Sequence, residues 1–438
     1  MRALVPVLVL LAAPPAQQDE RPAAGSREGA FVPLFDGASL AGWTTTGGRY
    51  DGPARWTVED GCIVGRTTEK GEGGLLYTER FFHSFELTLE VKMDHPFDSG
   101  VFLRMLPPDT GLKGVQVTLD HRPGGEIGAV YADGFLQHNE HGAKHYRKDE
   151  WNHVRVHCVG RDFRLQAWVN GEPVTDYRLP PGTKGFAESG RIGLQVHPAE
   201  PGPNVVRFRA IAIRELPVFD PDEFRVDDAG RLTPVGEGWQ DLLAGGDALP
   251  AFAPRAEDSG FAVRDGVLAL LVDGTADELR TVEDFADFEL RLDFKLAPLA
   301  NSGIFLRADR ARTDSAFSGC EVQILDDHGW EAATRTVLKP WQKTGSLYGA
   351  VAPRVQGTLA PNGVWNTLEI RYQGTRLRTR LNGFTLYDVD TAELRPELGP
   401  PFSARAKRGF LGIQRHAPGG AVEGAAFAWI RNAFVRRL

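Results

Sequence analysis

The chain has 438 residues, of which 42% are hydrophobic and 25% are charged, and this balance excludes a disordered or fibrous protein. Its formal net charge of -8 offers no basic surface for nucleic acid or anionic lipid, so a neutral or polar ligand is expected. The three cysteines form an odd set without Cys-x-x-Cys spacing, which argues against a disulfide framework and predicts buried free thiols.

The first residues have the pattern of a secretory signal peptide. Arg2 supplies a positive charge, residues 3–13 form an apolar run, and Ala16 is a small residue before a cleavage point. The apolar run is too short to span a bilayer. We therefore expect residues 1–16 to be a signal peptide, residues 17–30 to be a polar tether, and the mature protein to be exported to the periplasm or the extracellular space.

The remainder of the chain contains an internal repeat, because blocks of its first half recur in the same order in its second half. The paired blocks are VEDG (58–61) with VRDG (263–266), FELTLE (85–90) with FELRLD (288–293), SGVFLR (99–104) with SGIFLR (302–307), WN at 151 and 365, NG at 170 and 382, and GLQVH (193–197) with GIQRH (412–416). This order predicts one domain over residues 31–216, a Pro-bearing linker over 217–237 and a second domain over 238–438.

Most of the paired blocks predict β-strands. Residues 85–91 and 288–294 alternate apolar with charged side chains, as a half-buried strand does. Asn170-Gly171 and Asn382-Gly383 each separate two alternating runs, and both predict a tight hairpin because a type I′ turn needs positive φ at both central residues. Many short strands with Gly and Pro between them predict a β-sandwich or jelly roll in each half.

The first copy also resembles a known family through the ordered blocks "FVPLFDGASLAGW", "WTVEDGCIVG", "SGVFLR", "DEWNHVRV", "WVNGEPV" and "RIGLQVH". These blocks are similar to the 3-keto-disaccharide hydrolase domain family, and the second copy follows more loosely through "NSGIFLR", "CEVQILDDH" and "GFLGIQRH". The resemblance implies an all-β fold of two tandem concanavalin-like jelly-roll β-sandwich domains. It also implies an enzyme acting on 3-keto-glycosides, in which a base removes the C2 proton and the C1 substituent is lost.

In the second copy, polar residues alternate with apolar ones on two blocks. Glu321 and Gln323 share one face of their strand, and Gln414 and His416 share one face of another. With Arg307 at the end of a third block, the resemblance predicts a site in which Glu321 and His416 are catalytic. The further predicted substrate contacts are Asp326, Trp330 and Trp341. A solvated sheet face is the alternative interpretation of this pattern.

The first copy departs from this pattern when the blocks are compared by residue type. Gln116 is matched with Gln323, and Asp120-His121 with Asp327-His328, which leaves Gly114 opposite Glu321. We therefore expect the second domain to be catalytic. The first domain is expected either to bind sugar or to use Asp120, His121 and His197, with Arg104 and Gln195 as further substrate contacts.

The sequence contains a group of histidines but no established metal-binding motif around it. Three histidines, His138, His141 and His145, lie in one short segment, but no HExxH motif accompanies them, so a solvated loop lining the cleft is expected. A divalent metal held by Glu321 or Asp326 is a further hypothesis, because such an ion could polarise a 3-keto oxygen.

Two other functions fit the same sequence. A non-catalytic carbohydrate-binding or adhesion protein with two lectin-like sandwiches would need neither a base nor an acid. An ordinary glycosidase with two facing carboxylates is the weaker alternative, because only one acidic residue is placed on the predicted face. A carbohydrate is the expected partner in every case, and the oligomeric state has no signature in the sequence.

Overall fold

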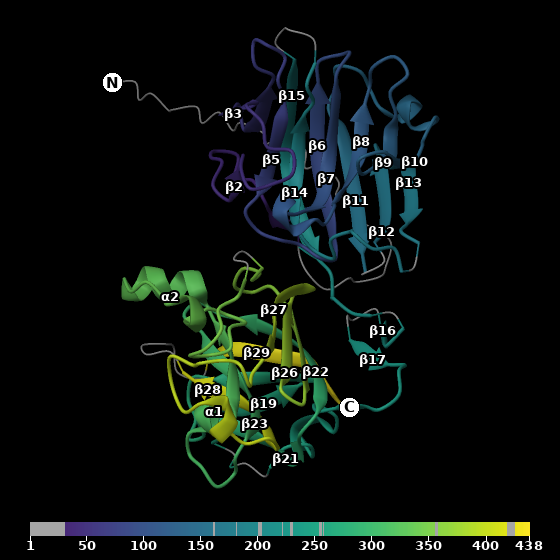
Figure 1. Cartoon of the computed structure of the whole chain (residues 1–438). Helices are drawn as coiled ribbons and strands as arrows, with labels where there is room; N and C mark the ends of the chain where they lie inside the picture. Colours follow the sequence, from purple (N-terminus) through teal and green to yellow (C-terminus); the bar gives the residue numbers. More distant parts are fainter. Residues whose placement is uncertain are drawn as a thin grey trace, which may run out of the picture.

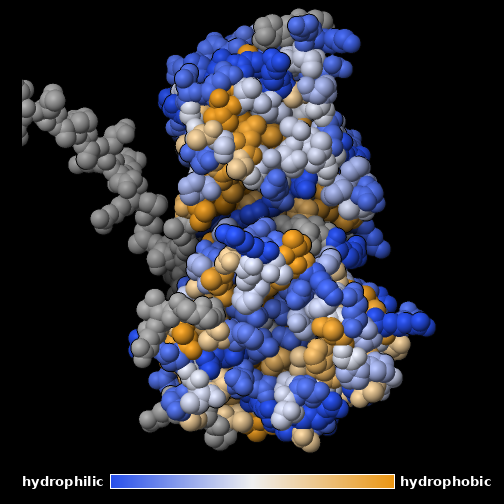
Figure 2. All heavy atoms as spheres, turned by 90° about the vertical axis from the view of Figure 1, so that its left-hand side faces the viewer, coloured by the Kyte–Doolittle hydropathy of each residue, from blue (hydrophilic) through white to orange (hydrophobic). Residues whose placement is uncertain are grey.

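The computed structural model describes residues 31–160, 163–180, 182–199, 204–220, 222–227, 231–253, 256, 258–354, 358–417 and 425–438. The predicted signal peptide and tether lie outside these residues. The described chain forms two β-sandwiches stacked end to end, joined by a small hairpin (Figure 1). The face of the molecule in Figure 2 is mostly hydrophilic, with apolar patches on both sandwiches.

The first sandwich consists of two antiparallel sheets, which we call its site sheet and its back sheet. The site sheet has the order β10 (Phe135–Gln137), β9 (Ile127–Tyr131), β8 (Val115–Asp120), β7 (Asp98–Met105), β14 (Arg191–Val196), β5 (Gly74–Thr78) and β2 (Trp43–Thr44). The back sheet has the order β13 (Glu172–Arg178), β12 (Arg164–Val169), β11 (Asn152–Val159), β6 (Phe85–Met93), β15 (Val205–Glu215), β4 (Cys62–Arg66) and β3 (Arg55–Glu59), with β1 (Val32–Pro33) on β15.

The second sandwich repeats this plan with a smaller site sheet. Its site sheet has the order β21 (Glu278–Phe285), β28 (Gly409–His416), β23 (Asn301–Ala308) and β24 (Cys320–Leu325). Its back sheet has the order β19 (Phe261–Arg264), β20 (Val267–Leu271), β29 (Ala426–Arg437), β22 (Phe288–Leu296), β25 (Asn366–Gln373), β26 (Arg376–Leu381) and β27 (Phe384–Asp390), with β18 (Trp239–Asp241) on β29. Two short helices, α1 (Ser315–Ser318) and α2 (Asp327–Thr334), flank β24.

Strand alternation explains how the cores form. In β6, Leu87, Leu89 and Val91 are fully buried, whereas the residues between them carry charge or hydroxyl groups. The apolar faces of both sheets close on one another in each sandwich, which gives each its own hydrophobic core. The structure therefore has the all-β, tandem concanavalin-like jelly-roll fold that the sequence predicts, and its three cysteines are buried free thiols.

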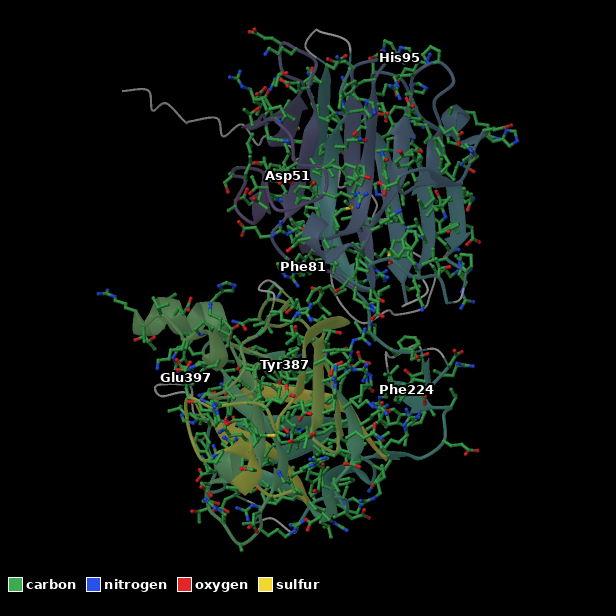
Figure 3. The ribbon with its side chains drawn as sticks, viewed as in Figure 1. Asp51, Phe81, His95, Phe224, Tyr387 and Glu397 are labelled. Atoms are coloured by element: carbon green, nitrogen blue, oxygen red, sulfur yellow. The ribbon has the colours of Figure 1, made fainter. Side chains whose placement is uncertain are left out.

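Both predicted hairpin turns are present, and the second one lies at the contact between the two sandwiches. Asn382 and Gly383 have φ values of +49° and +79°, as a type I′ turn requires. Directly after this turn, Phe384 stacks on Phe81 of the first sandwich with ring centroids 5.6 Å apart, at the junction visible in Figure 3. Arg380 pairs with Glu188 across the same junction.

The segment between the sandwiches is more structured than a simple linker. It contains the hairpin of β16 (Phe224–Val226) and β17 (Leu232–Pro234). Phe224 and Leu232 pack with Phe434 of β29 in one buried cluster, and Glu223 pairs with Arg436 at 2.9 Å. The hairpin therefore covers part of the second sandwich.

This packing predicts a stability difference between two fragments of the second half. Residues 238–438 should fold cooperatively alone, and residues 217–438 should be more stable by about 1–3 kcal/mol, because only the longer fragment buries Phe224 and Leu232. Urea unfolding of the two fragments measures the difference. Phe224→Ala in the longer fragment should remove most of it, whereas equal stabilities of the two wild-type fragments would show that the hairpin contributes nothing.

Candidate functional site

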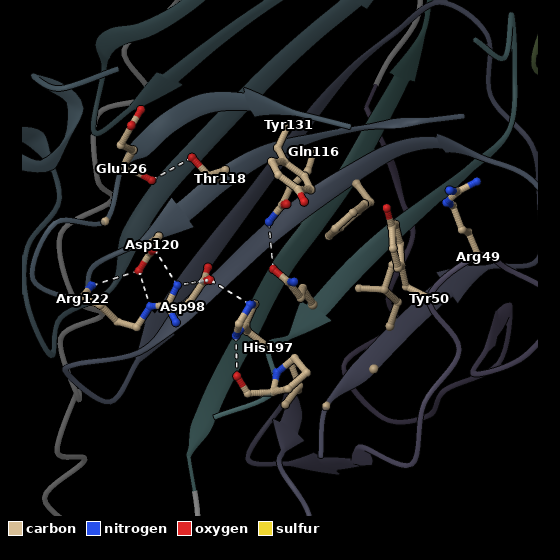
Figure 4. Close-up of a pocket in the computed structure, with 18 of the residues that line it drawn as sticks. Arg49, Tyr50, Asp98, Gln116, Thr118, Asp120, Arg122, Glu126, Tyr131 and His197 are labelled. Carbon is tan, nitrogen blue, oxygen red and sulfur yellow. Dashed lines mark hydrogen bonds and ion pairs between the residues drawn. The ribbon is translucent and has the colours of Figure 1, made fainter. Parts of the chain in front are cut away.

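A pocket of about 620 Å³ opens on the outward face of the first sandwich's site sheet. Its floor comes from β7, β8 and β14, and its walls come from the loops around Tyr50, Glu126 and Pro198 (Figure 4). Its lining includes charged, polar and aromatic side chains, namely Arg49, Tyr50, Asp98, Gln116, Asp120, Arg122, Tyr131, Phe135, Gln195 and His197. Of the residues predicted from sequence, the structure thus gathers Gln116, Asp120, Gln195 and His197.

The position of Asp98 follows from strand parity. Val101 and Leu103 of β7 point into the core, so Asp98, Gly100 and Phe102 point outward. Asp98 lies opposite Asp120 on β8 in the antiparallel register. Only 7% of Asp98 is exposed, so a carboxyl group is buried at one end of the pocket.

A single guanidinium joins the two carboxyl groups. Arg122 donates from Nε and Nη2 to the two oxygens of Asp120, at 2.9 Å and 2.8 Å, and Nη2 also lies 2.8 Å from Asp98 Oδ2. The short loop after β8 returns Arg122 over the strand end, where its backbone N–H also donates to Asp120. This network holds the acidic end of the pocket in one arrangement.

The imidazole of His197 approaches Asp98 from the other side. Its Nε2 lies 3.3 Å from Asp98 Oδ2, and its Nδ1 lies 2.5 Å from the carbonyl oxygen of Pro198 (Figure 4). A carbonyl oxygen can only accept a hydrogen bond, so Nδ1 carries a proton and Nε2 faces the carboxyl group. The Asp98–His197 pair can therefore share a proton between Oδ2 and Nε2.

The environment shifts the pKa values of this pair in opposite directions. Burial, reinforced by the neighbouring charge of Asp120, raises the pKa of Asp98 to about 7, although Arg122 opposes the shift. Burial and the Arg122 charge lower the pKa of His197. Both shifts favour a proton on the carboxyl group over a charged imidazole, so the pair is poised for proton transfer near neutral pH.

Two amides form the middle of the pocket floor. Gln116 donates from Nε2 to Gln195 Oε1 at 2.8 Å, and its side chain lies directly over Gly100. A Cβ added at Gly100 would lie 2.2 Å from Gln116 Nε2, so only glycine leaves room for this side chain.

Strand register corrects the residue matching that we made from sequence. Phe102 is opposite Gln116 in the first sandwich, and the equivalent Phe305 is opposite Glu321 in the second. Gln116 therefore corresponds to Glu321, and Gly114 corresponds to Gly319, not to Glu321. An added Cβ would lie 2.3 Å from Leu103 O at Gly114 and 2.2 Å from Leu306 O at Gly319, which supports the same correspondence.

The corrected matching shows that the two sandwiches carry different side chains at the equivalent positions of their site sheets. Asn301 occupies the position of Asp98, because each residue begins the central strand of its site sheet. Leu325 occupies the position of Asp120, because each ends the next strand opposite that residue. The second sandwich has His416 and Gln414 where the first has His197 and Gln195, but it lacks both carboxyl groups of the acidic end.

The predicted partnership of Glu321 with His416 is not seen in the structure. Glu321 is opposite Phe305 and His416 is opposite Asn301, four residues away, which separates them by roughly 13 Å along the strands. His416 is exposed, whereas Glu321 is 3% exposed and burial raises its pKa to about 8. Gln323 and Gln414 flank Gly303, and Gln323 donates to Asn301.

Arg104 and Arg307 do not reach the outward faces where we predicted substrate contacts. Each has a positive φ, +55° and +53°, at a shift in strand register that turns the side chain inward. Arg104 donates to the carbonyl oxygens of His83 and Gly160, and Arg307 lies 3.5 Å from the ring centroid of Tyr372 in the back sheet. Both arginines tie one sheet to the other.

Four other predicted contacts also lie outside the pocket. His121 packs between His95 and Tyr146. Asp326 caps α2, where its carboxylate accepts hydrogen bonds from the backbone N–H groups of Leu299 and Gly329. Trp330 lies on α2 of the second sandwich, and Trp341 is 7% exposed against Tyr348.

The histidine segment also lies apart from the pocket lining. His138 is exposed and contacts Glu126 Oε1 at 2.7 Å, and neither it, His141 nor His145 lines the pocket. Within the described ranges, no group of three or more His, Cys, Asp or Glu side chains is arranged to hold a metal ion. No helix in that part of the chain is long and apolar enough to cross a membrane.

Asp98 was missed in the sequence because it directly precedes the paired block SGVFLR and is not repeated in the second copy. The signal that could have found it is the difference itself: an acid in one copy and the amide of Asn301 in the other. Arg122 was missed because the loop that returns it to Asp120 has no periodic pattern.

Comparison with known proteins relates both halves of the chain to one family. The model of the 3-keto-alpha-glucoside-1,2-lyase-like domain matches residues 30–214 and 237–436. A 3-keto-disaccharide hydrolase of Bacteroides thetaiotaomicron is 36% identical over 77 residues, which are 16% of this chain and 26% of the relative. The match thus spans about a quarter of that relative's length.

Two solved structures are also similar to part of the chain. A Parabacteroides distasonis protein, provisionally described as a glycosyl hydrolase, is 25% identical, with a TM-score of 0.39 over 46% of this chain and 99% of that one. A Bacillus subtilis protein of unknown function with a galectin-like fold is 12% identical, with a TM-score of 0.34 over 43% of this chain and 97% of that one.

The raised pKa of Asp98 predicts how stability depends on pH. The unfolded carboxyl group has its ordinary pKa near 3.8, so the folded state binds more protons between that pH and about 7, and the stability due to this group falls as pH rises through the interval. Asp98→Asn removes this loss. Relative to wild type, the variant should gain up to about 1.4 kcal/mol per pH unit between pH 5 and 7.

Urea unfolding of both proteins at pH 5, 6, 7 and 8 measures this gain. Asp36→Asn is the control, because hydrogen bonds from Ala38 and Ser39 lower the pKa of that exposed carboxyl and its titration lies below the tested range. A constant difference between Asp98→Asn and wild type across this range would contradict the raised pKa.

Proposed function

The chain belongs to the 3-keto-alpha-glucoside-1,2-lyase-like domain family, and on this premise we propose that the pocket of the first sandwich cleaves 3-keto-glycosides. The observation that carries the proposal is the Asp98–His197 pair, whose carboxyl group has a pKa near neutral pH and lies at the end of a pocket with room for a sugar. Such a pair is the proton-transfer group that this chemistry needs.

The reaction begins at C2 of the sugar. A ketone at C3 acidifies the C2 hydrogen, and its removal leaves an enolate whose negative charge lies on the C3 oxygen. The electron pair then forms the C1=C2 double bond as the bond from C1 to the leaving oxygen breaks, and that oxygen takes up a proton. Addition of water to the double bond converts the lyase product to the hydrolysis product.

Asp98 is the base in this scheme. With its proton removed and His197 neutral, the carboxylate accepts the C2 proton, and the hydrogen bond to His197 Nε2 at 3.3 Å then holds that proton near the substrate. The same proton can pass to the departing oxygen. Because the base form needs a deprotonated Asp98, activity should fall as pH drops below the pKa of about 7.

Arg122 supplies the positive charge for the enolate. Its Nε and Nη2 are used by Asp120 and Asp98, so Nη1 is the nitrogen left for the C3 oxygen. Asp120 holds the guanidinium in place, which means that little reorganisation is needed when charge develops on the substrate. Asp120 therefore acts through Arg122 as a positioning residue.

The second sandwich does not have these groups at the equivalent positions. Asn301 and Leu325 cannot accept a proton where Asp98 and Asp120 stand in the first sandwich. The catalytic roles predicted from sequence for Glu321 and His416 remain a hypothesis about a second, separate site, and the same experiment tests it.

The proposal predicts different effects of isosteric changes in the two sandwiches. Asp98→Asn keeps the size of the side chain and removes its basicity, so kcat on a 3-keto-glucoside should fall roughly 10²- to 10⁴-fold with little change in substrate affinity. Glu321→Gln should alter kcat far less. Steady-state kinetics on 3-keto-glucosides and their unoxidised parents, with binding measured calorimetrically, provide both quantities.

The opposite result would assign catalysis to the other sandwich. If Glu321→Gln abolishes turnover and Asp98→Asn does not, the second sandwich is catalytic. If wild-type protein binds the sugars but cleaves none of them, the chain is a carbohydrate-binding protein instead.

A further inference from the structure

The pocket is larger than one sugar ring requires. A cavity of about 150 Å³ holds a benzene ring, and a hexose ring is of similar order, whereas this pocket measures about 620 Å³. The Asp98–His197 pair occupies only one end of it. The other end is lined by different residues, and these have no part in the proton transfer described above.

This second end is aromatic. Tyr50 and Phe102 contact each other with ring centroids 5.4 Å apart, and Tyr131 and Phe135 do so at 5.4 Å. Phe135 lies on β10 at the edge of the site sheet, where its ring also stacks on His138 with centroids 4.3 Å apart, and 48% of the residue is still exposed. We call Tyr50, Phe102, Tyr131 and Phe135 the aromatic end.

Tyr50 is fixed in position by charged neighbours. Its hydroxyl donates to Asp133 Oδ1 at 2.7 Å, and Asp133 also pairs with Arg49 at 2.7 Å and with Lys113 at 3.2 Å. Burial and the Asp133 carboxylate raise the pKa of Tyr50 to about 12, so the hydroxyl keeps its proton. With the hydroxyl occupied, the ring is the part of Tyr50 that is offered to a ligand.

The two ends are connected by the amides of Gln116 and Gln195. In Figure 4 Gln116, which donates to Gln195, lies between the His197 cluster and Tyr50 and close to Tyr131. C1 is bonded to C2, so a sugar with C2 at Asp98 places its C1 substituent next to the catalytic end. The room available for that substituent leads over the amides to the aromatic end.

We infer that the aromatic end binds the leaving group of the substrate and selects leaving groups that present the face of a six-membered ring. An aryl group offers a planar face and a second sugar offers the C–H face of its chair, and either face can stack on aromatic side chains. This inference rests on the proposed function, because it presumes that the sugar reacts at Asp98. Tyr50 and Phe135 are its specificity-determining residues.

The test compares three substrates that differ only in the leaving group. They are methyl 3-keto-α-glucoside, 4-nitrophenyl 3-keto-α-glucoside and 3-keto-trehalose. The readout is the ratio of kcat/KM for each ring-bearing substrate to that for the methyl glycoside. Tyr50→Ala and Phe135→Ala should each lower this ratio about 10-fold, through KM rather than kcat.

Two further variants distinguish the loss of ring stacking from the loss of the Tyr50 hydroxyl and from the general effect of removing an exposed aromatic ring. Tyr50→Phe should retain most of the ratio, because it keeps the ring and loses only the hydroxyl bound to Asp133. Phe31→Ala is the matched control, because Phe31 is also an exposed phenylalanine, at 37%, but lies outside the pocket, and it should leave the ratio at the wild-type value.

The outcomes distinguish this inference from the proposed function. An unchanged ratio in both Tyr50→Ala and Phe135→Ala, with all substrates still cleaved, would overturn the aromatic end alone. A loss of the ratio for only one ring-bearing substrate would identify the leaving group as a sugar or as an aryl group. Failure of wild-type protein to cleave any of the three substrates would instead overturn the proposed function.

Discussion

A carboxyl group that is buried on a sheet face loses the water that would stabilise its charge and needs polar partners instead. At Asp98 the side chains that serve as these partners form the acidic end of the pocket. Burial disfavours its charge, Arg122 on one side opposes that effect, and the resulting pKa is about 7, while His197 Nε2 lies 3.3 Å away on the other side. These partners lie just after the ends of β8 and β14, which both pair with β7 although β14 is far along the chain. The jelly-roll order of strands therefore brings Asp98, Arg122 and His197 together.

In the two tandem copies, the inward side chains that hold the sheets together are alike, whereas the outward side chains differ. The inward arginines Arg104 and Arg307 make the same kind of contact to the opposite sheet in both copies. On the outward faces, the acids Asp98 and Asp120 of the first copy are replaced by Asn301 and Leu325. Two copies of the sandwich can thus share the pattern of the core and differ in the outward side chains at equivalent positions, because outward side chains do not contribute to the core.

The sequence predicted the fold well because strand alternation, Asn-Gly turns and the ordered repeat all report local geometry. It could not set the residue correspondence along β8 and β24, since a slip of two residues leaves every side chain on its own face. It also could not show that Arg104 sits at a register shift, because the shift depends on pairing with β14. Gln116, Asp120, Gln195 and His197 were found, whereas Asp98 and Arg122 required the structure.

In the proposed reaction, cleavage begins with removal of the C2 proton in the first sandwich. The most direct measurement is the kinetic isotope effect on kcat/KM with a 3-keto-glucoside deuterated at C2. The protiated substrate should react faster, because the C2–H bond breaks in the step that we assign to the Asp98–His197 pair. Equal rates for the two substrates, with cleavage still occurring, together with an undiminished rate in Asp98→Asn, would contradict this reaction scheme.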